Sequence, residues 1–76
     1  MTTKGLIGIK ALDPYTVIDE LEGQDEVVFV VKVDSLHDVV AFVEHENMKA
    51  LSEFVFFTIR AIPGVKNTET TIMLDE

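Results

Sequence analysis

The side chains that could do chemistry in this sequence gather near its middle, around two histidines. His37 and His45 stand eight positions apart, and Asp38, Glu44 and Glu46 lie beside them. Imidazole and carboxylate are common metal ligands, so a metal site is the first interpretation to consider. The spacing argues against it, because it forms no compact group of ligands. We therefore expect no metal and no other cofactor.

Catalytic motifs are equally scarce. The 76 residues include no cysteine, and they contain neither a nucleophile elbow nor a glycine-rich phosphate loop. The acidic residues are many but scattered, which is typical of a charged surface. We predict no catalytic residues and no enzymatic activity. A small dimeric α+β-barrel enzyme, such as a monooxygenase or an isomerase-like protein, stays as an alternative, because it shares the topology predicted below.

The charge balance limits the possible partners. Fourteen acidic residues outnumber six scattered basic ones, which gives a formal charge of −8. Binding to DNA depends on clustered lysines and arginines, so we expect no direct DNA binding. No stretch approaches the roughly 20 apolar residues of a membrane span, and no signal-peptide pattern is visible. We expect a cytoplasmic protein that does not contact a membrane.

The apolar pattern predicts the element order β-α-β-β-α-β. Asp13-Pro14 is typical of a helix start, Asn47 caps a second helix, and Pro63-Gly64 ends it at about residue 61. This order is that of the ferredoxin-like α+β fold, with an antiparallel four-stranded sheet and two helices on one face. One domain is expected to cover residues 1–76. The expected strands are Gly5–Leu12, Val27–Val33, Val39–Glu44 and Val65–Leu74.

Two of these strands are apolar on both sides. Val27–Val33 and Val39–Val43 hardly alternate between apolar and polar residues, unlike strands with one face in water. Two helices cover only one face of the sheet, so the other face needs a different cover. Small folds often rely on oligomerisation because their cores are small. We therefore predict a homodimer that packs through this other face.

The second helix is unusually rich in apolar residues. Five of them recur at helical spacing and are predicted to face the core. Three phenylalanines do not all fit this stripe, and they form either the edge of the core and its aromatic surface, or a second contact between dimers. The predicted core stripe is Met48, Leu51, Val55, Ile59 and Ile62, and the phenylalanines are Phe54, Phe56 and Phe57.

Three segments follow the pattern of a known family. The helix end Ile62-Pro63-Gly64-Val65 fits the family's (I/L)-P-G-V, and Thr68-Glu69-Thr70 fits its Thr-x-Thr strand. The hairpin Val33-Asp34-Ser35-Leu36-His37-Asp38 fits V-x-G-x-(Y/H)-D, with serine in place of the glycine. In this order they resemble the effector domain of the Lrp/AsnC family, also called RAM for regulation of amino-acid metabolism. The resemblance runs from about Gly5 to Leu74.

The resemblance implies a stand-alone RAM protein, because the family's usual helix-turn-helix domain is missing from the sequence. It implies a homodimer with its sheets face to face, and assembly of four such dimers into an octamer. The implied function is to bind a small effector, an amino acid, and to influence transcription indirectly, including by co-assembly with full-length Lrp/AsnC regulators. An ACT-type amino-acid-binding module has the same strand order and stays as an alternative.

The resemblance also implies an effector site where dimers meet, near the hairpin turn and the Thr-x-Thr strand. Asp38 would pair with the ammonium group of an amino acid, and turn N–H groups or threonine hydroxyls would bind its carboxylate. Asp38 has an alternative role as a cap of the turn, and threonine is common in strands anyway. The implied ligand contacts are Ser35, Leu36, His37, Asp38, Thr68 and Thr70.

Overall fold

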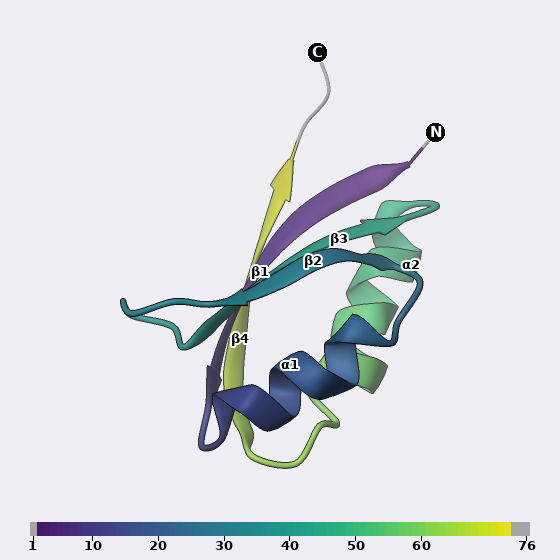
Figure 1. Ribbon diagram of the computed structural model, residues 1–76. Coiled ribbons are helices and arrows are strands. Elements are labelled where there is room, and N and C mark those ends of the chain that lie inside the picture. Colours follow the sequence, from purple (N-terminus) through teal and green to yellow (C-terminus); the bar gives the residue numbers. More distant parts are fainter. Residues whose placement is uncertain (1, 74–76) are drawn as a thin grey trace.

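The computed structural model describes residues 2–73, and in them four strands form one antiparallel sheet in the order β2-β3-β1-β4 (Figure 1). The helices pack on the same side of this sheet, so the predicted ferredoxin-like βαββαβ fold is confirmed. Three of the four strands begin at the predicted residue, and the other described strand ends differ from the predictions by one or two residues. The predicted last residue, Leu74, lies outside the described residues. The elements are β1 (Thr3–Ala11), α1 (Pro14–Glu22), β2 (Val27–Lys32), β3 (Val39–His45), α2 (Met48–Phe54), the π-helical turn η1 (Val55–Ile59) and β4 (Val65–Met73).

Both helices begin where the sequence predicts a cap. The Asp13 carboxylate accepts hydrogen bonds from the Thr16 hydroxyl at 2.8 Å and from the Thr16 backbone N–H at 3.5 Å. Asn47 accepts the Ala50 N–H at 2.7 Å and starts α2 in the same way. Such caps satisfy N–H groups that the first helical turn leaves unpaired. Within the described part of the chain, no helix has the length and apolarity of a membrane span.

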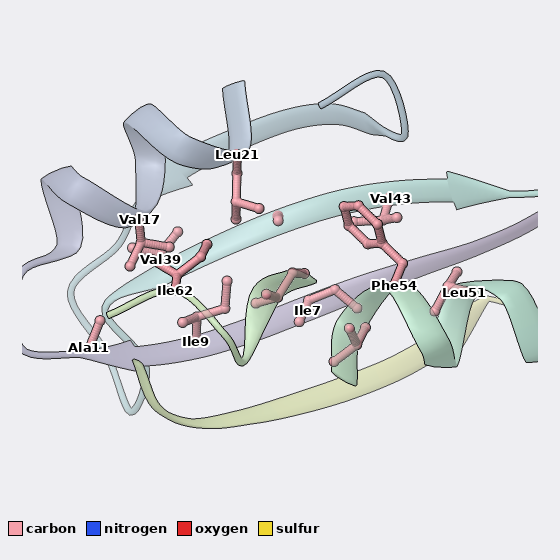
Figure 2. Close-up of a cluster of buried hydrophobic side chains, with 13 residues drawn as sticks. Ile7, Ile9, Ala11, Val17, Leu21, Val39, Val43, Leu51, Phe54 and Ile62 are labelled. Atoms are coloured by element: carbon pink, nitrogen blue, oxygen red, sulfur yellow. The ribbon is translucent and has the colours of Figure 1, made fainter. Parts of the chain in front are cut away.

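The core lies between the sheet and the two helices. Alternate residues of β1 point to this side, and Ile7, Ile9 and Ala11 are buried there. Figure 2 shows them facing side chains from α1, β3 and α2. The residues that complete the buried cluster are Val17, Leu21, Val39, Ala41, Val43, Leu51, Phe54, Val55, Ile59 and Ile62.

The second helix differs from its prediction in one turn. Its α-helical hydrogen bonds end at Phe54, and the Arg60 N–H then bonds to the carbonyl of Val55, five residues earlier, at 2.9 Å. A π turn is wider than an α turn. Phe54 lies before this turn, three residues after Leu51, and is buried with it on the core side of α2, whereas Phe56 and Phe57 stay exposed. The prediction for Met48 is wrong: it is 54% exposed, because it is the first residue of α2 and lies at the rim of the core.

The sheet side that faces away from the helices is named the open face. Its members follow from the strand registers, since paired residues on neighbouring strands point to the same side. Phe29 and Phe42 lie side by side there, with ring centroids 5.4 Å apart. Charged residues of both signs surround them. The open face consists of Lys4, Leu6, Gly8, Lys10, Phe29, Val31, Val40, Phe42, Glu44, Asn67, Glu69, Thr71 and Met73.

Candidate functional site

The loop between β2 and β3, residues 33–38, holds four of the six predicted ligand contacts. Asp38 ties this loop to the end of β1 with two hydrogen bonds. Its N–H donates to the Ile9 carbonyl at 2.9 Å, and its Oδ2 accepts the Ala11 N–H at 3.0 Å. The Val33 N–H donates to the Asp38 carbonyl at 2.9 Å and closes the loop. The loop is therefore held in place by backbone contacts that centre on Asp38.

The charge of Asp38 is stabilised by these surroundings. The hydrogen bond from the Ala11 N–H lowers the pKa of the carboxyl below its ordinary value, although partial burial acts in the opposite direction. Lys10, Lys32 and Lys66 lower the pKa further. Lys10 is the nearest described cation, with its Nζ 4.0 Å from Oδ2. Asp38 is thus a carboxylate at neutral pH, as a partner for an ammonium group must be.

His37 lies on the open face, directly over Gly8 of β1. A Cβ atom at Gly8 would be 2.8 Å from both Cγ and Nδ1 of the imidazole, which is closer than real Cβ contacts. On the far side of β1, the His37 Nε2 is 3.7 Å from Oε1 of Glu69 on β4. The imidazole therefore reaches from the loop across one strand to the next.

Gly8 and Glu69 are site neighbours that the sequence analysis missed. A signal for Gly8 was present, because a glycine inside a strand often marks a close approach by another group. No comparable signal exists for Glu69. It meets His37 only because the register pairs Gly8 with Glu69 across β1 and β4, and a register depends on the whole sheet.

The remaining predicted contacts occupy two different places. Ser35 and Leu36 form the tip of the loop, where Leu36 is 86% exposed. Thr68 and Thr70 pair with Ile9 and Ile7, so they lie on the helix side of β4. In one copy, β1 separates the loop from both threonines. The structure thus groups the four loop residues and leaves the two threonines apart from them.

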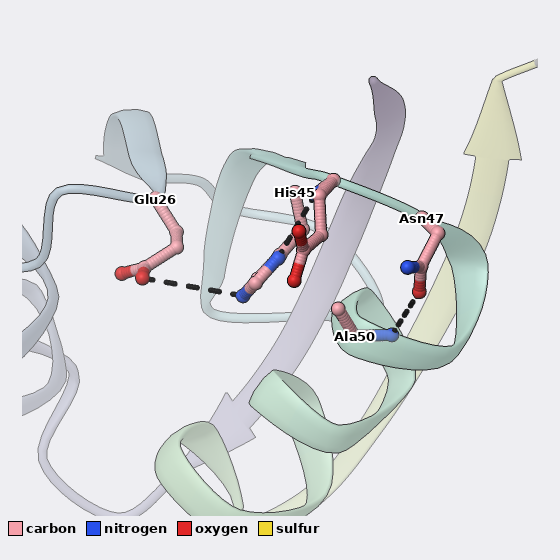
Figure 3. Close-up of polar contacts among 5 residues, drawn as sticks. Glu26, His45, Asn47 and Ala50 are labelled. Carbon is pink, nitrogen blue, oxygen red and sulfur yellow. Dashed lines mark hydrogen bonds and ion pairs between the residues drawn. The ribbon is translucent and has the colours of Figure 1, made fainter. Parts of the chain in front are cut away.

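The second histidine lies on the other side of the sheet. His45 pairs with Thr3 and its ring is 6.2 Å from that of Phe54, which is on the helix side. Figure 3 shows its surroundings: the Glu46 N–H donates to Nδ1 at 3.0 Å, and Nε2 lies 4.0 Å from a carboxylate oxygen of Glu26. The two histidines therefore cannot share one metal ion. Among residues 2–73, no three metal-binding side chains gather into a possible site.

Comparisons with known proteins give a consistent result. Residues 6–76 match the Lrp/AsnC ligand binding domain. The fold is similar to that of Escherichia coli AsnC, with a TM-score of 0.87 and 23% identity over 97% of this chain and 52% of AsnC. A hypothetical protein from Pyrococcus horikoshii has a TM-score of 0.83 and 27% identity, covering 100% of this chain and 93% of that protein. A search of curated protein sequences gives no match.

A third similar structure contains a ligand. It is a feast or famine regulatory protein from M. tuberculosis complexed with L-methionine, with a TM-score of 0.82 and 26% identity over 97% of this chain and 51% of that one. The chain thus spans about half the length of AsnC and of the mycobacterial protein. The family match covers residues 6–76, which is nearly the whole sequence. The chain belongs to the Lrp/AsnC ligand-binding domain family.

Proposed function

We propose that residues 1–76 act as one regulatory unit in the cytoplasm, which forms a homodimer, binds an amino acid and influences transcription indirectly. It neither binds DNA by itself nor catalyses a reaction. The observation that carries this proposal is the match of residues 6–76 to a ligand-binding domain of transcription regulators. The L-methionine complex of the mycobacterial relative makes an amino acid the first effector class to test.

A second copy of this chain is the partner that fits the open face. The centre of this face is apolar, and Phe29 there is 47% exposed although it is a large aromatic residue. A twofold interface sets one patch against itself, so its charges must be self-complementary. The open face meets this condition with two lysines and two glutamates, although the chain as a whole has a charge of −8. These four residues are Lys4, Lys10, Glu44 and Glu69.

A second contact surface supports further assembly. Phe56 and Phe57 project from η1 with ring centroids 5.1 Å apart, and the Arg60 guanidinium lies 5.2 Å from the centroid of Phe56. Exposed aromatic residues beside an arginine are typical of residues that dominate interface energies. This group is the contact through which dimers join, in an octamer of four dimers or in co-assembly with full-length Lrp/AsnC regulators.

The effector binds at the loop of residues 33–38. Asp38 pairs with the ammonium group of the amino acid through Oδ1, because Oδ2 already accepts the Ala11 N–H. Loop N–H groups and threonine hydroxyls bind the carboxylate. Since β1 lies between the loop and the threonines in one copy, a ligand that touches both takes them from different copies. The proposed contacts are Ser35, Leu36, His37, Asp38, Thr68 and Thr70.

A thermal-shift screen of the twenty amino acids, with L-methionine first, tests the binding proposal. A ligand at 100 times its Kd stabilises the folded state by about 2.7 kcal/mol, which such a screen detects. We expect at least one amino acid to raise the Tm and Asp38→Ala to abolish the effect. Asp34→Ala is the matched control, because it removes the same charge from the same loop without touching β1. If no amino acid shifts the Tm, the chain is not an amino-acid sensor.

A gel-shift titration with duplex DNA tests the other part of the proposal. The acidic chain should give no complex at physiological salt, because it lacks the basic surface that displaces counterions from phosphates. Tight binding that weakens as salt increases would show that the chain contacts DNA directly.

A further inference from the structure

His37 belongs to two proposed sites, the effector loop of residues 33–38 and the open face of the sheet. The residue belongs to the proposed effector loop by sequence, but its imidazole lies on the open face, through which the proposed dimer forms. Its side chain is only 21% exposed in the single copy, whereas that of Glu69, its partner across β1, is 75% exposed. The side chain of His37 thus packs on the open face already in the single copy.

Gly8 leaves a gap in the open face that the imidazole fills. The register places Val31, Val40, Gly8 and Glu69 in one row across the four strands. Every other member of this row has a side chain, and a Cβ at Gly8 would overlap the ring, at 2.8 Å from two of its atoms. Without the imidazole, a second copy packed on this face would lie over a void and lose contacts there.

The loop is fixed by the residue directly after His37. Asp38 makes the hydrogen bonds to Ile9 and Ala11 that hold the loop on β1. His37 and Asp38 are adjacent in the chain, so the residue that fills the open face is joined directly to the residue that holds the loop on β1.

We propose that His37 couples effector binding to dimerisation by switching between two positions, seated on Gly8 or displaced into solvent. The inference rests on the proposed function. A second copy packs over the row that contains Gly8. It therefore favours the seated position, in which the ring fills the gap at Gly8. The seated ring holds the loop in the conformation that the effector recognises. Coupling between sites is reciprocal, so the effector strengthens the dimer by the same factor by which the dimer strengthens effector binding.

Hydrogen exchange at the Val33 and Asp38 amides tests this coupling without a known effector. Both N–H groups are hydrogen-bonded in the loop. Exchange is measured well below and well above the protein concentration at which the chain dimerises. In the native sequence we expect dimerisation to slow exchange at both amides by about fivefold or more, in the usual range of coupling between sites. In His37→Ala we expect this slowing to disappear.

Three further variants separate coupling from loss of structure. In Gly8→Ala the new Cβ displaces the ring, so the slowing should be lost as in His37→Ala, and the double variant should lose no more than either single one. His37→Tyr keeps a flat ring over Gly8 and should retain the slowing. An equal slowing in His37→Ala and in the native sequence would overturn the coupling but not the dimer. A chain that never dimerises would overturn the dimer itself and the coupling with it.

Discussion

Both faces of the sheet carry apolar residues, but those on one face are buried and those on the other are partly exposed. On the helix side, Ile7, Ile9 and Val39 are completely buried by the chain's own helices. On the open face, Phe29, Val31 and Leu6 are between 36% and 47% exposed. The helix side is mostly aliphatic, whereas the open face combines aromatic rings with charged residues of both signs.

This difference separates residues that stabilise the fold from residues that are available to a partner. A buried aliphatic residue contributes to stability whatever the concentration of the protein. An exposed one contributes only when a partner covers it, and its effect then depends on concentration. Substitutions on the helix side should therefore lower the stability of the fold, whereas substitutions on the open face should mainly weaken assembly.

The largest effect is expected from Ile7→Ala on the helix side. This residue is fully buried, and removing its side chain leaves a cavity, which costs about 2–5 kcal/mol of unfolding free energy. Its neighbour Leu6 lies on the open face, so Leu6→Ala should cost about 1 kcal/mol or less. Both values are measured by denaturation at a protein concentration too low for dimers. Equal losses in the two variants would show that the faces do not differ.

The next effect should appear in assembly and not in the fold. Phe29→Glu puts a charge in the apolar centre of the open face, where a second copy would bury it without a partner. We expect the dimer Kd to rise by about 30-fold or more, as at interface residues that dominate binding. The measurement is sedimentation equilibrium, with circular dichroism to check folding.

Phe57→Glu is the control for this measurement, because it adds the same charge to an exposed phenylalanine outside the open face. It should leave the dimer Kd nearly unchanged and weaken only the larger assemblies. A dimer that tolerates Phe29→Glu but not Phe57→Glu would reverse the roles of the two surfaces.

The sequence predicted the helix side better than the open face. The alternation along the first strand puts Ile7, Ile9 and Ala11 on one face, because a strand exposes alternate residues to opposite sides, and this face is the buried one. The residue types also predicted both caps, at Asp13 and Asn47, since capping depends on residues only three positions apart. Local patterns of this kind are complete within a short stretch of sequence.

Features that depend on distant residues were not predicted. The π turn of η1 is one example, because no periodic pattern of an ordinary helix indicates it. The contact of His37 with Gly8 joins residues from different strands, and it requires both the register and the path of the loop. The candidate site was therefore predicted as four loop residues and two threonines of the last strand, whereas the neighbours Gly8 and Glu69 emerged only from the fold.

Asn47→Ala tests a smaller contribution to the helix side. The variant leaves the Ala50 N–H without its capping oxygen and should destabilise the chain by about 1 kcal/mol. Asn67→Ala is the matched control, because Asn67 lies on the open face and caps no helix. Thermal unfolding of dilute samples measures both. A larger loss in the control would mean that the open face contributes to the fold of the single copy.

The smallest effect is expected at Asp38, where the loop joins the sheet. Its pKa lies below the ordinary value of 3.8, so the folded chain favours the charged form and this contribution is fully present above that value. As the pH falls below 3.8 through the lowered pKa, the carboxyl becomes protonated and the contribution is lost.

The stability advantage of the native chain over Asp38→Asn should therefore be constant from pH 7 to pH 5 and vanish under stronger acid. A constant gap between the native chain and Asp38→Asn down to the lowest pH would mean that the Ala11 hydrogen bond does not depend on the charge, and that Asp38 holds the loop by its shape alone.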